Sequence, residues 1–129
     1  MSGVSLAITG EQQLYAELER YGAKATPAAA AALFEEAEDI MADSKENYVP
    51  VDVATLKNSG HVQRPDVSND RISVTLAYGG AAEDYAVVQH ERLDYRHTVG
   101  QAKYLERPLL KAVVGMAGRL AARIRGAFQ

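Results

Sequence analysis

The sequence contains no cysteine, which excludes disulfide scaffolds, zinc sites built on cysteine and cysteine nucleophiles. It has no apolar run near the roughly 18 residues that a membrane span requires. Residues 1–10 also lack the basic start and the long apolar core of a signal peptide. From these absences we expect a soluble protein of the cytosol that does not contact a membrane.

Motifs for nucleotide binding and for nucleophilic catalysis are missing as well. Gly79-Gly80 is not followed by the lysine and serine of a phosphate-binding loop, and the chain has no Gly-x-Ser-x-Gly nucleophile elbow. We therefore expect neither a cofactor nor catalytic residues.

One cluster has the residue types of a metal site. It consists of His90, Glu91, Asp94 and His97. On a continuous helix the spacing of His90, Asp94 and His97 would place the three side chains on one face. If they act together there, the protein is a metal-dependent or acid–base enzyme, and this is the alternative function. The pattern departs from a zinc-peptidase helix, which has histidine where this chain has Asp94. The other interpretation is a polar loop with no metal, in which a histidine contacts neighbouring carboxylates.

What the chain does have is an uneven distribution of charge. Residues 1–54 hold three basic and ten acidic side chains, a net charge of −7, whereas residues 55–129 hold eleven basic and seven acidic ones, a net charge of +4. Near the C-terminus the basic residues are Lys103, Arg107, Lys111, Arg119, Arg123 and Arg125. They could face solvent and complement a helix dipole, or pair with acidic groups within a subunit or between copies. A third interpretation is a DNA-binding regulator that uses Arg119, Arg123 and Arg125.

Helical periodicity and helix-ending residues predict the helices. The expected helices are residues 10–22, residues 27 to about 47, a short turn at 53–58, and a last helix from residue 103 or 104 onward. Thr26 is the expected N-cap of the long helix, Pro50 ends it, and Asp52 caps the short turn. Leu105 and Leu109 of the last helix are expected in the core. The long helix is expected to bury an apolar face that includes Leu33 and Ile40. Its acidic residues, among them Glu36, are expected on the opposite face, and Glu17 is expected off the apolar stripe of the first helix.

One segment alternates with the period of a β-strand. In residues 71–78 the apolar Ile72, Val74 and Leu76 are separated by polar neighbours. We expect residues 61–64 to pair with this strand across a turn at 65–70, residues 85–89 to form a helical turn, and residues 91–102 to form a polar loop. The predicted fold is a single α+β domain of residues 1–129. It has an arm and short helix in residues 1–25, then a small antiparallel sheet with the long helix and the C-terminal helix packed on it.

The order of several short motifs resembles a family of phage proteins. The motifs are Val49-Pro50-Val51-Asp52, then Tyr85-Ala86-Val87-Val88-Gln89-His90-Glu91, then Gly100-Gln101-Ala102-Lys103-Tyr104-Leu105. In this order and spacing the chain resembles the small neck and tail-completion proteins of tailed bacteriophages, also described as head–tail connector, minor capsid or minor tail proteins. The family-like core spans residues 26–110. Two departures are Val53-Ala54 in place of Thr-Gly, and Gln89-His90-Glu91 in place of a Val-Glu-x-Gly pattern.

The resemblance implies assembly rather than catalysis. Such proteins form rings, commonly hexamers or dodecamers, around the channel that DNA crosses. Their expected partners are other neck proteins, portal-adaptor proteins and tail-tube proteins. The chain would be assembled in the host cytoplasm and located in the virion. A ring has heterologous interfaces, and we expect carboxylates of one copy to face Arg119 or Arg123 of the next, with the loop at 91–102 as a second contact. The candidate interface residues are Glu35, Glu38, Asp39, Tyr85, His90, Glu91, His97, Tyr104, Arg119 and Arg123.

Overall fold

The computed structural model describes residues 2–5, 11–50, 54–68, 71–79, 84–91, 94–99 and 104–129. It confirms the α+β class, with an antiparallel sheet, a long helix and C-terminal helices. The helices are α1 (Glu11–Tyr21), the 3-10 helix η1 (Gly22–Lys24), α2 (Ala25–Asn47), α3 (Ala54–Ser59), α4 (Glu106–Val113) and α5 (Met116–Ala127). The strands are β1 (Ser2–Ser5), β2 (His61–Val62), β3 (Asp66–Ser68), β4 (Arg71–Tyr78), β5 (Asp84–Glu91) and β6 (Asp94–Val99). Asp52 lies outside the described residues.

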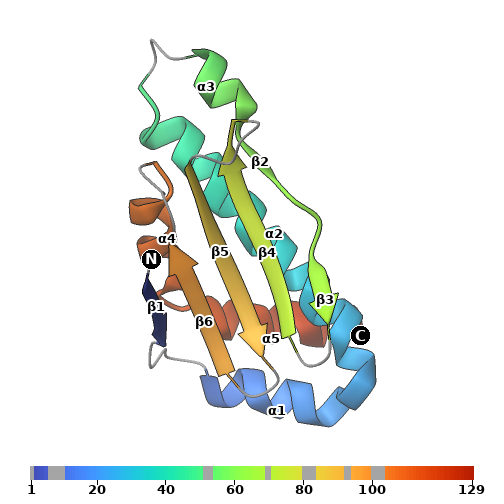
Figure 1. The fold of residues 1–129 in the computed structure, drawn as a ribbon. Coiled ribbons are helices and arrows are strands. Elements are labelled where there is room, and N and C mark those ends of the chain that lie inside the picture. Colours follow the sequence, from blue (N-terminus) through green and yellow to red (C-terminus); the bar gives the residue numbers. More distant parts are fainter. Residues whose placement is uncertain are drawn as a thin grey trace.

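The sheet is antiparallel throughout its described strands and forms one layer of the molecule. Its order is β1-β6-β5-β4-β2, and β3 pairs with β4 on the same side as β2. Figure 1 shows α2 and α5 behind the sheet and α4 to the side near β6, so that one face of the sheet is covered by helices and the other is open. Antiparallel sheets tolerate this arrangement because their strands alternate between buried and exposed side chains.

The core lies between the covered face of the sheet and the helices. Ile72, Val74 and Leu76 alternate along β4 and are each at most 5% exposed, as their spacing predicts. Leu105 and Leu109 are confirmed as core residues with no exposed surface. No helix in the described part of the chain combines the length and apolar character needed to cross a bilayer.

Three predictions of local structure for the segments between residues 65 and 99 are wrong. Residues 85–89 belong to strand β5 rather than to a helical turn. Residues 94–99 of the expected polar loop at 91–102 are strand β6, which pairs with β5. The expected turn at 65–70 contains strand β3. In each case the backbone groups find partners in the strand that is next along the chain, and the residue types of these segments alone do not indicate this pairing.

Two predictions about helix ends are also wrong. Helix α2 begins at Ala25, and η1 leads directly into it without a side-chain cap, so Thr26 lies inside the first turn. The C-terminal helix is divided in two by Val114, which is extended, and Gly115, which has a φ angle of 76°. A positive φ angle is unfavourable for residues that have a Cβ atom but not for glycine. Gly115 therefore allows α5 to start in a new direction.

A buried hydrogen-bond network ties α2 to the sheet and to the start of α4. The Ser44 hydroxyl donates to the backbone carbonyl of Tyr104 at 2.6 Å, and its oxygen lies 2.7 Å from the Tyr78 hydroxyl. Since serine has a single hydroxyl hydrogen, Tyr78 is the donor in the second bond. The rings of Tyr78 and Tyr104 also meet edge to face, with centroids 6.3 Å apart. These contacts hold three elements that are distant in the sequence.

Gly60 packs against this network so closely that it has no room for a side chain. A Cβ there would lie 2.6 Å from Cε1 of Tyr78 and 2.9 Å from Sδ of Met41, both of which are buried. We expect Gly60→Ala to lower the free energy of unfolding by about 1–3 kcal/mol, as overpacked cores do. Urea unfolding measures this. Gly118→Ala is the matched control, because nothing lies within 4 Å of a Cβ at this position in α5. It is expected to raise stability by about 0.5–1 kcal/mol. Equal losses in both variants would contradict the packing argument.

Candidate functional site

A network of ion pairs joins α2 to α5. Glu36 of α2 is 3% exposed, and each of its carboxylate oxygens accepts a hydrogen bond from an arginine of α5. The Nε atoms of Arg119 and Arg123 lie 2.9 Å from Oε1 and Oε2 respectively. A buried carboxylate requires such donors, because an unpaired buried charge is strongly destabilising. Glu36 was expected on the solvent face of the helix, and this assignment is wrong.

Arg123 extends the network to the helix surface. Its terminal nitrogens lie 3.2 Å from carboxylate oxygens of both Glu35 and Asp39. Burial alone would lower the pKa of the Arg123 guanidinium, but the hydrogen bond to Glu36 and the surrounding carboxylates outweigh it and raise that pKa. Arg123 is therefore charged throughout the accessible pH range and remains paired within the protein.

Arg119 has a second role at the break between α4 and α5. Besides binding Glu36, its guanidinium donates to the backbone carbonyls of Val114, at 3.0 Å, and Ala112. These carbonyls lie at the C-terminal end of α4, where the last four carbonyls of a helix lack intrahelical donors and the helix dipole favours a cation. One side chain thus stabilises the end of α4 and the packing of α5 on α2.

Further pairs connect the acidic and basic halves of the chain. Arg125 of α5 lies 3.4 Å from a carboxylate oxygen of Glu17 in α1, which is itself 5% exposed. At the C-terminal end of α5 the rings of Phe128 and Tyr21 stack with centroids 3.9 Å apart. Of the interpretations of the basic helix, pairing within a subunit is the one that the structure shows for Arg119, Arg123 and Arg125.

Lys111 of α4 and Asp43 of α2 form a pair with a defined pH dependence. Their charged atoms are 2.8 Å apart. The hydrogen bond from Lys111 lowers the pKa of Asp43, and the bond to Asp43 raises the pKa of Lys111. Since the folded-state pKa of Asp43 is depressed, its contribution to stability is present above the unfolded pKa and is lost as the pH falls through the folded pKa.

We therefore expect Asp43→Asn to destabilise the protein at pH 7 and to have a progressively smaller effect below about pH 4. Guanidinium unfolding of both proteins at several pH values measures the difference. Glu46→Gln on the same helix is the control, because Glu46 is exposed and forms no ion pair among the described residues. A difference for Asp43→Asn that does not change between pH 7 and pH 3 would contradict the assignment.

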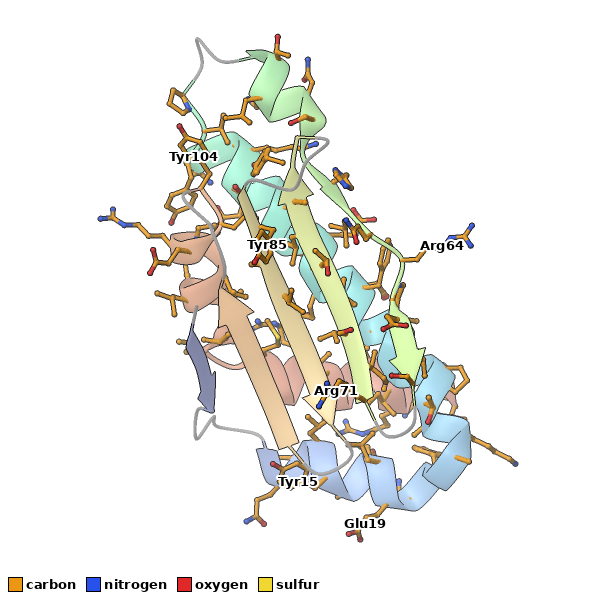
Figure 2. The ribbon with its side chains drawn as sticks, viewed as in Figure 1. Tyr15, Glu19, Arg64, Arg71, Tyr85 and Tyr104 are labelled. Atoms are coloured by element: carbon orange, nitrogen blue, oxygen red, sulfur yellow. The ribbon has the colours of Figure 1, made fainter. Side chains whose placement is uncertain are left out.

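The open face of the sheet carries one of the predicted interface residues. Tyr85 and Val87 of β5 are half-buried, whereas the intervening Ala86 and the following Val88 are buried on the covered face. Ser73 and Thr75 of β4 lie directly opposite Gln89 and Val87 in the register. Figure 2 shows Tyr85 and Arg71 on the side of the sheet away from the helices. This face is therefore a mixed surface of aromatic, β-branched and polar residues.

The other predicted interface residues are scattered. Glu35, Glu38 and Asp39 lie on the exposed side of α2, and of these only Glu38 has no ion pair in the described part of the structure. Tyr104 is half-buried and belongs to the network around Ser44. The side chains of His90, Glu91 and His97 lie outside the described part, although their backbones belong to β5 and β6. The seven residues whose side chains the structure describes thus do not form a single surface.

The continuous helix assumed for the metal-site hypothesis is wrong, because His90 lies in β5 and Asp94 and His97 lie in β6. In the register, His90 is opposite Tyr95 and His97 is opposite Val88. The side chains of His90, Asp94 and His97 lie outside the described part of the structure, so the metal site itself stays a hypothesis. Among the residues whose side chains the structure describes, no group of three metal-ligating side chains occurs.

The described surface has an open sheet face, a basic helix whose arginines are paired internally, and exposed carboxylates on α2. Searches against models of protein families, curated proteins and solved structures found no match to this chain.

Proposed function

We propose that this chain is a structural subunit of the head–tail neck of a tailed bacteriophage, where copies form a ring around the DNA channel. The observation that supports it best is the two-layer architecture. The described helices lie on one face or at the ends of the sheet, and the opposite face is uncovered over the length of β4 and β5. A surface of this kind suits contacts with other subunits, and the motif order of the sequence points to the same family of proteins.

The interface of this ring does not depend on the arginines of α5. Arg119 and Arg123 already pair with carboxylates of their own chain. We therefore expect residues other than these arginines to form the contacts between copies. The same observation disfavours the DNA-binding regulator, because arginines held by carboxylates offer little charge to phosphate groups. The open face and the flanks of the sheet are the remaining candidates for subunit contact.

A nonsense mutation in the gene tests the proposal. Cells that produce this mutant phage should accumulate filled heads and separate tails, which negative-stain electron microscopy distinguishes from joined particles. Supplying the chain from a plasmid should restore joined particles, and antibodies should label the head–tail junction of the restored virions. Joined, infectious particles that lack the chain would contradict the proposal, as would labelling elsewhere on the virion.

A further inference from the structure

Helices α4 and α5 are separated by two residues that have the geometry of a hinge. Val114 has φ and ψ angles of −66° and 118°, and Gly115 has angles of 76° and 1°. Val114 is also 75% exposed, so little packing fixes its conformation. Figure 1 shows α5 crossing behind the sheet in a direction that differs from that of α4. Rotation of these two residues to helical angles would join α4 and α5 into one straight helix.

The apolar pattern of the sequence continues through the hinge without a break. Buried residues recur every three or four positions in both helices, and they are Leu109, Val113, Met116, Leu120 and Ile124. On one continuous helix these side chains would lie on a single face. The bend therefore depends on the hinge residues and their contacts rather than on a change in the apolar pattern.

Arg119 supplies hydrogen bonds that the bend removes. In a continuous helix the carbonyl of Ala112 would accept from the N–H of residue 116, and that of Val114 from the N–H of residue 118. In the bent chain both carbonyls accept from the guanidinium of Arg119 instead. A straight helix would turn these carbonyls toward its own N–H groups, so Arg119 stabilises the bent form specifically.

A straight hinge would carry α5 away from α2 of its own chain. Glu36, which is 3% exposed in the bent form, would then lose its two donors, Arg119 and Arg123. A carboxylate in this position is strongly destabilising without partners. The segment that restores the contacts is α5 of a second copy, since it carries the same two arginines and the same apolar face. Exchange of an identical element between copies has a low free-energy cost, because the exchanged contacts are those of the closed chain.

We propose that Val114 and Gly115 form a hinge that Arg119 keeps bent, and that α5 docks on α2 of a second copy when the hinge straightens. The bent and exchanged forms share the contacts of α5 with α2 and differ at the hinge, so Gly115 and Arg119 set the balance between them. This exchange goes beyond the proposed neck function. It is tested on the purified chain, so that either proposal can fail alone.

Cross-linking between two differently labelled chains measures the exchange. The rings of Tyr21 in α1 and Phe128 at the end of α5 stack with centroids 3.9 Å apart. Tyr21→Cys on one chain and Phe128→Cys on a mass-tagged chain should therefore come together when α5 has exchanged, and the natural chain adds no cysteine of its own. The two full-length chains are unfolded together in urea, refolded, treated with a short bismaleimide and separated on a denaturing gel.

Gly115→Ala in both chains should raise the mixed product about ten-fold. Alanine is unfavourable at a φ angle of 76° and is better than glycine in a continuous helix. Gly118→Ala is the matched control and should leave the yield unchanged, because it makes the same change inside α5, where nothing lies within 4 Å of a Cβ. Val114→Pro should abolish the product, since proline fits a φ angle of −66° but cannot continue a helix. No rise with Gly115→Ala, or an equal rise with Gly118→Ala, would overturn the hinge.

Two lysine variants test Arg119 and do not depend on the folding of Gly115→Ala. Arg119→Lys keeps a positive charge beside Glu36 but lacks the guanidinium fork that reaches both carbonyls of α4. The mixed product should therefore rise at least three-fold. Arg123→Lys is the matched control, because Arg123 also donates to Glu36 from Nε but its printed partners are all carboxylates. Equal yields from the two lysine variants, each shown to be folded by circular dichroism, would overturn the proposal.

Discussion

Replacing both Arg119 and Arg123 with methionine is expected to destabilise the protein by about 3–5 kcal/mol. Methionine retains much of the apolar volume of the arginine stems but removes both donors to Glu36, which is 3% exposed. The carboxylate is then left buried without a partner. The substitution of Arg119 also removes the donor to the last carbonyls of α4. Chemical denaturation at neutral pH measures the loss.

A third substitution separates the buried charge from the loss of packing. Adding Glu36→Leu to the double variant should recover most of the lost stability, because a buried ion pair replaced by apolar residues of similar size often costs nothing. Arg125→Met is a further comparison, since Arg125 pairs with Glu17 of α1 and not with Glu36. If the triple variant is no more stable than the double variant, the buried carboxylate is not the cause of the loss.

The neighbouring leucines of α4 should respond very differently to truncation. Leu109→Ala is expected to lower the free energy of unfolding by about 2–5 kcal/mol, because Leu109 has no exposed surface and its removal leaves a cavity. Leu110→Ala should change stability by less than about 0.5 kcal/mol, since Leu110 is 46% exposed. Thermal or urea unfolding measures the stability of the two variants. The comparison is matched, because both variants carry a Leu→Ala change in α4.

This pair also separates folding from assembly. Leu109→Ala should lose assembly only through loss of folded protein, whereas Leu110→Ala should keep the stability of the natural chain. Circular dichroism confirms folding, and size-exclusion chromatography reports assembly. A large loss of stability in Leu110→Ala would show that its environment is more buried than its 46% exposure indicates.

Periodicity predicted the parts of the fold that depend on local pattern. The alternation of Ile72, Val74 and Leu76 identified β4, and the apolar face of α2 through Leu33 and Ile40 is buried as expected. Strands β5 and β6 were missed because their residues do not alternate regularly between apolar and polar types, although they pair as hairpins with β4 and with each other. Strand β1 was missed because its partner β6 lies far along the chain.

The burial of Glu36 could have been found from its spacing. It follows Leu33 by three residues and precedes Ile40 by four, which is the spacing of side chains on one face of a helix. Glu17 likewise follows the buried Leu14 by three residues. Both glutamates were predicted to face solvent because glutamate is a charged residue. Their spacing from the buried residues instead indicates the apolar face of each helix. What the sequence could not provide is the identity of their partners on α5, which are more than 80 residues away.

The pairing of the first helices with the last has a consequence for synthesis. Glu36 of α2 obtains both of its donors from Arg119 and Arg123 of α5, more than 80 residues later in the chain. A nascent chain on the ribosome therefore holds a carboxylate that cannot be buried at low cost until α5 has been synthesised. We expect this domain to fold only after α5 has left the ribosome, and chains that terminate before α5 to remain open to proteases. Only chains that contain α5 would then be available for assembly.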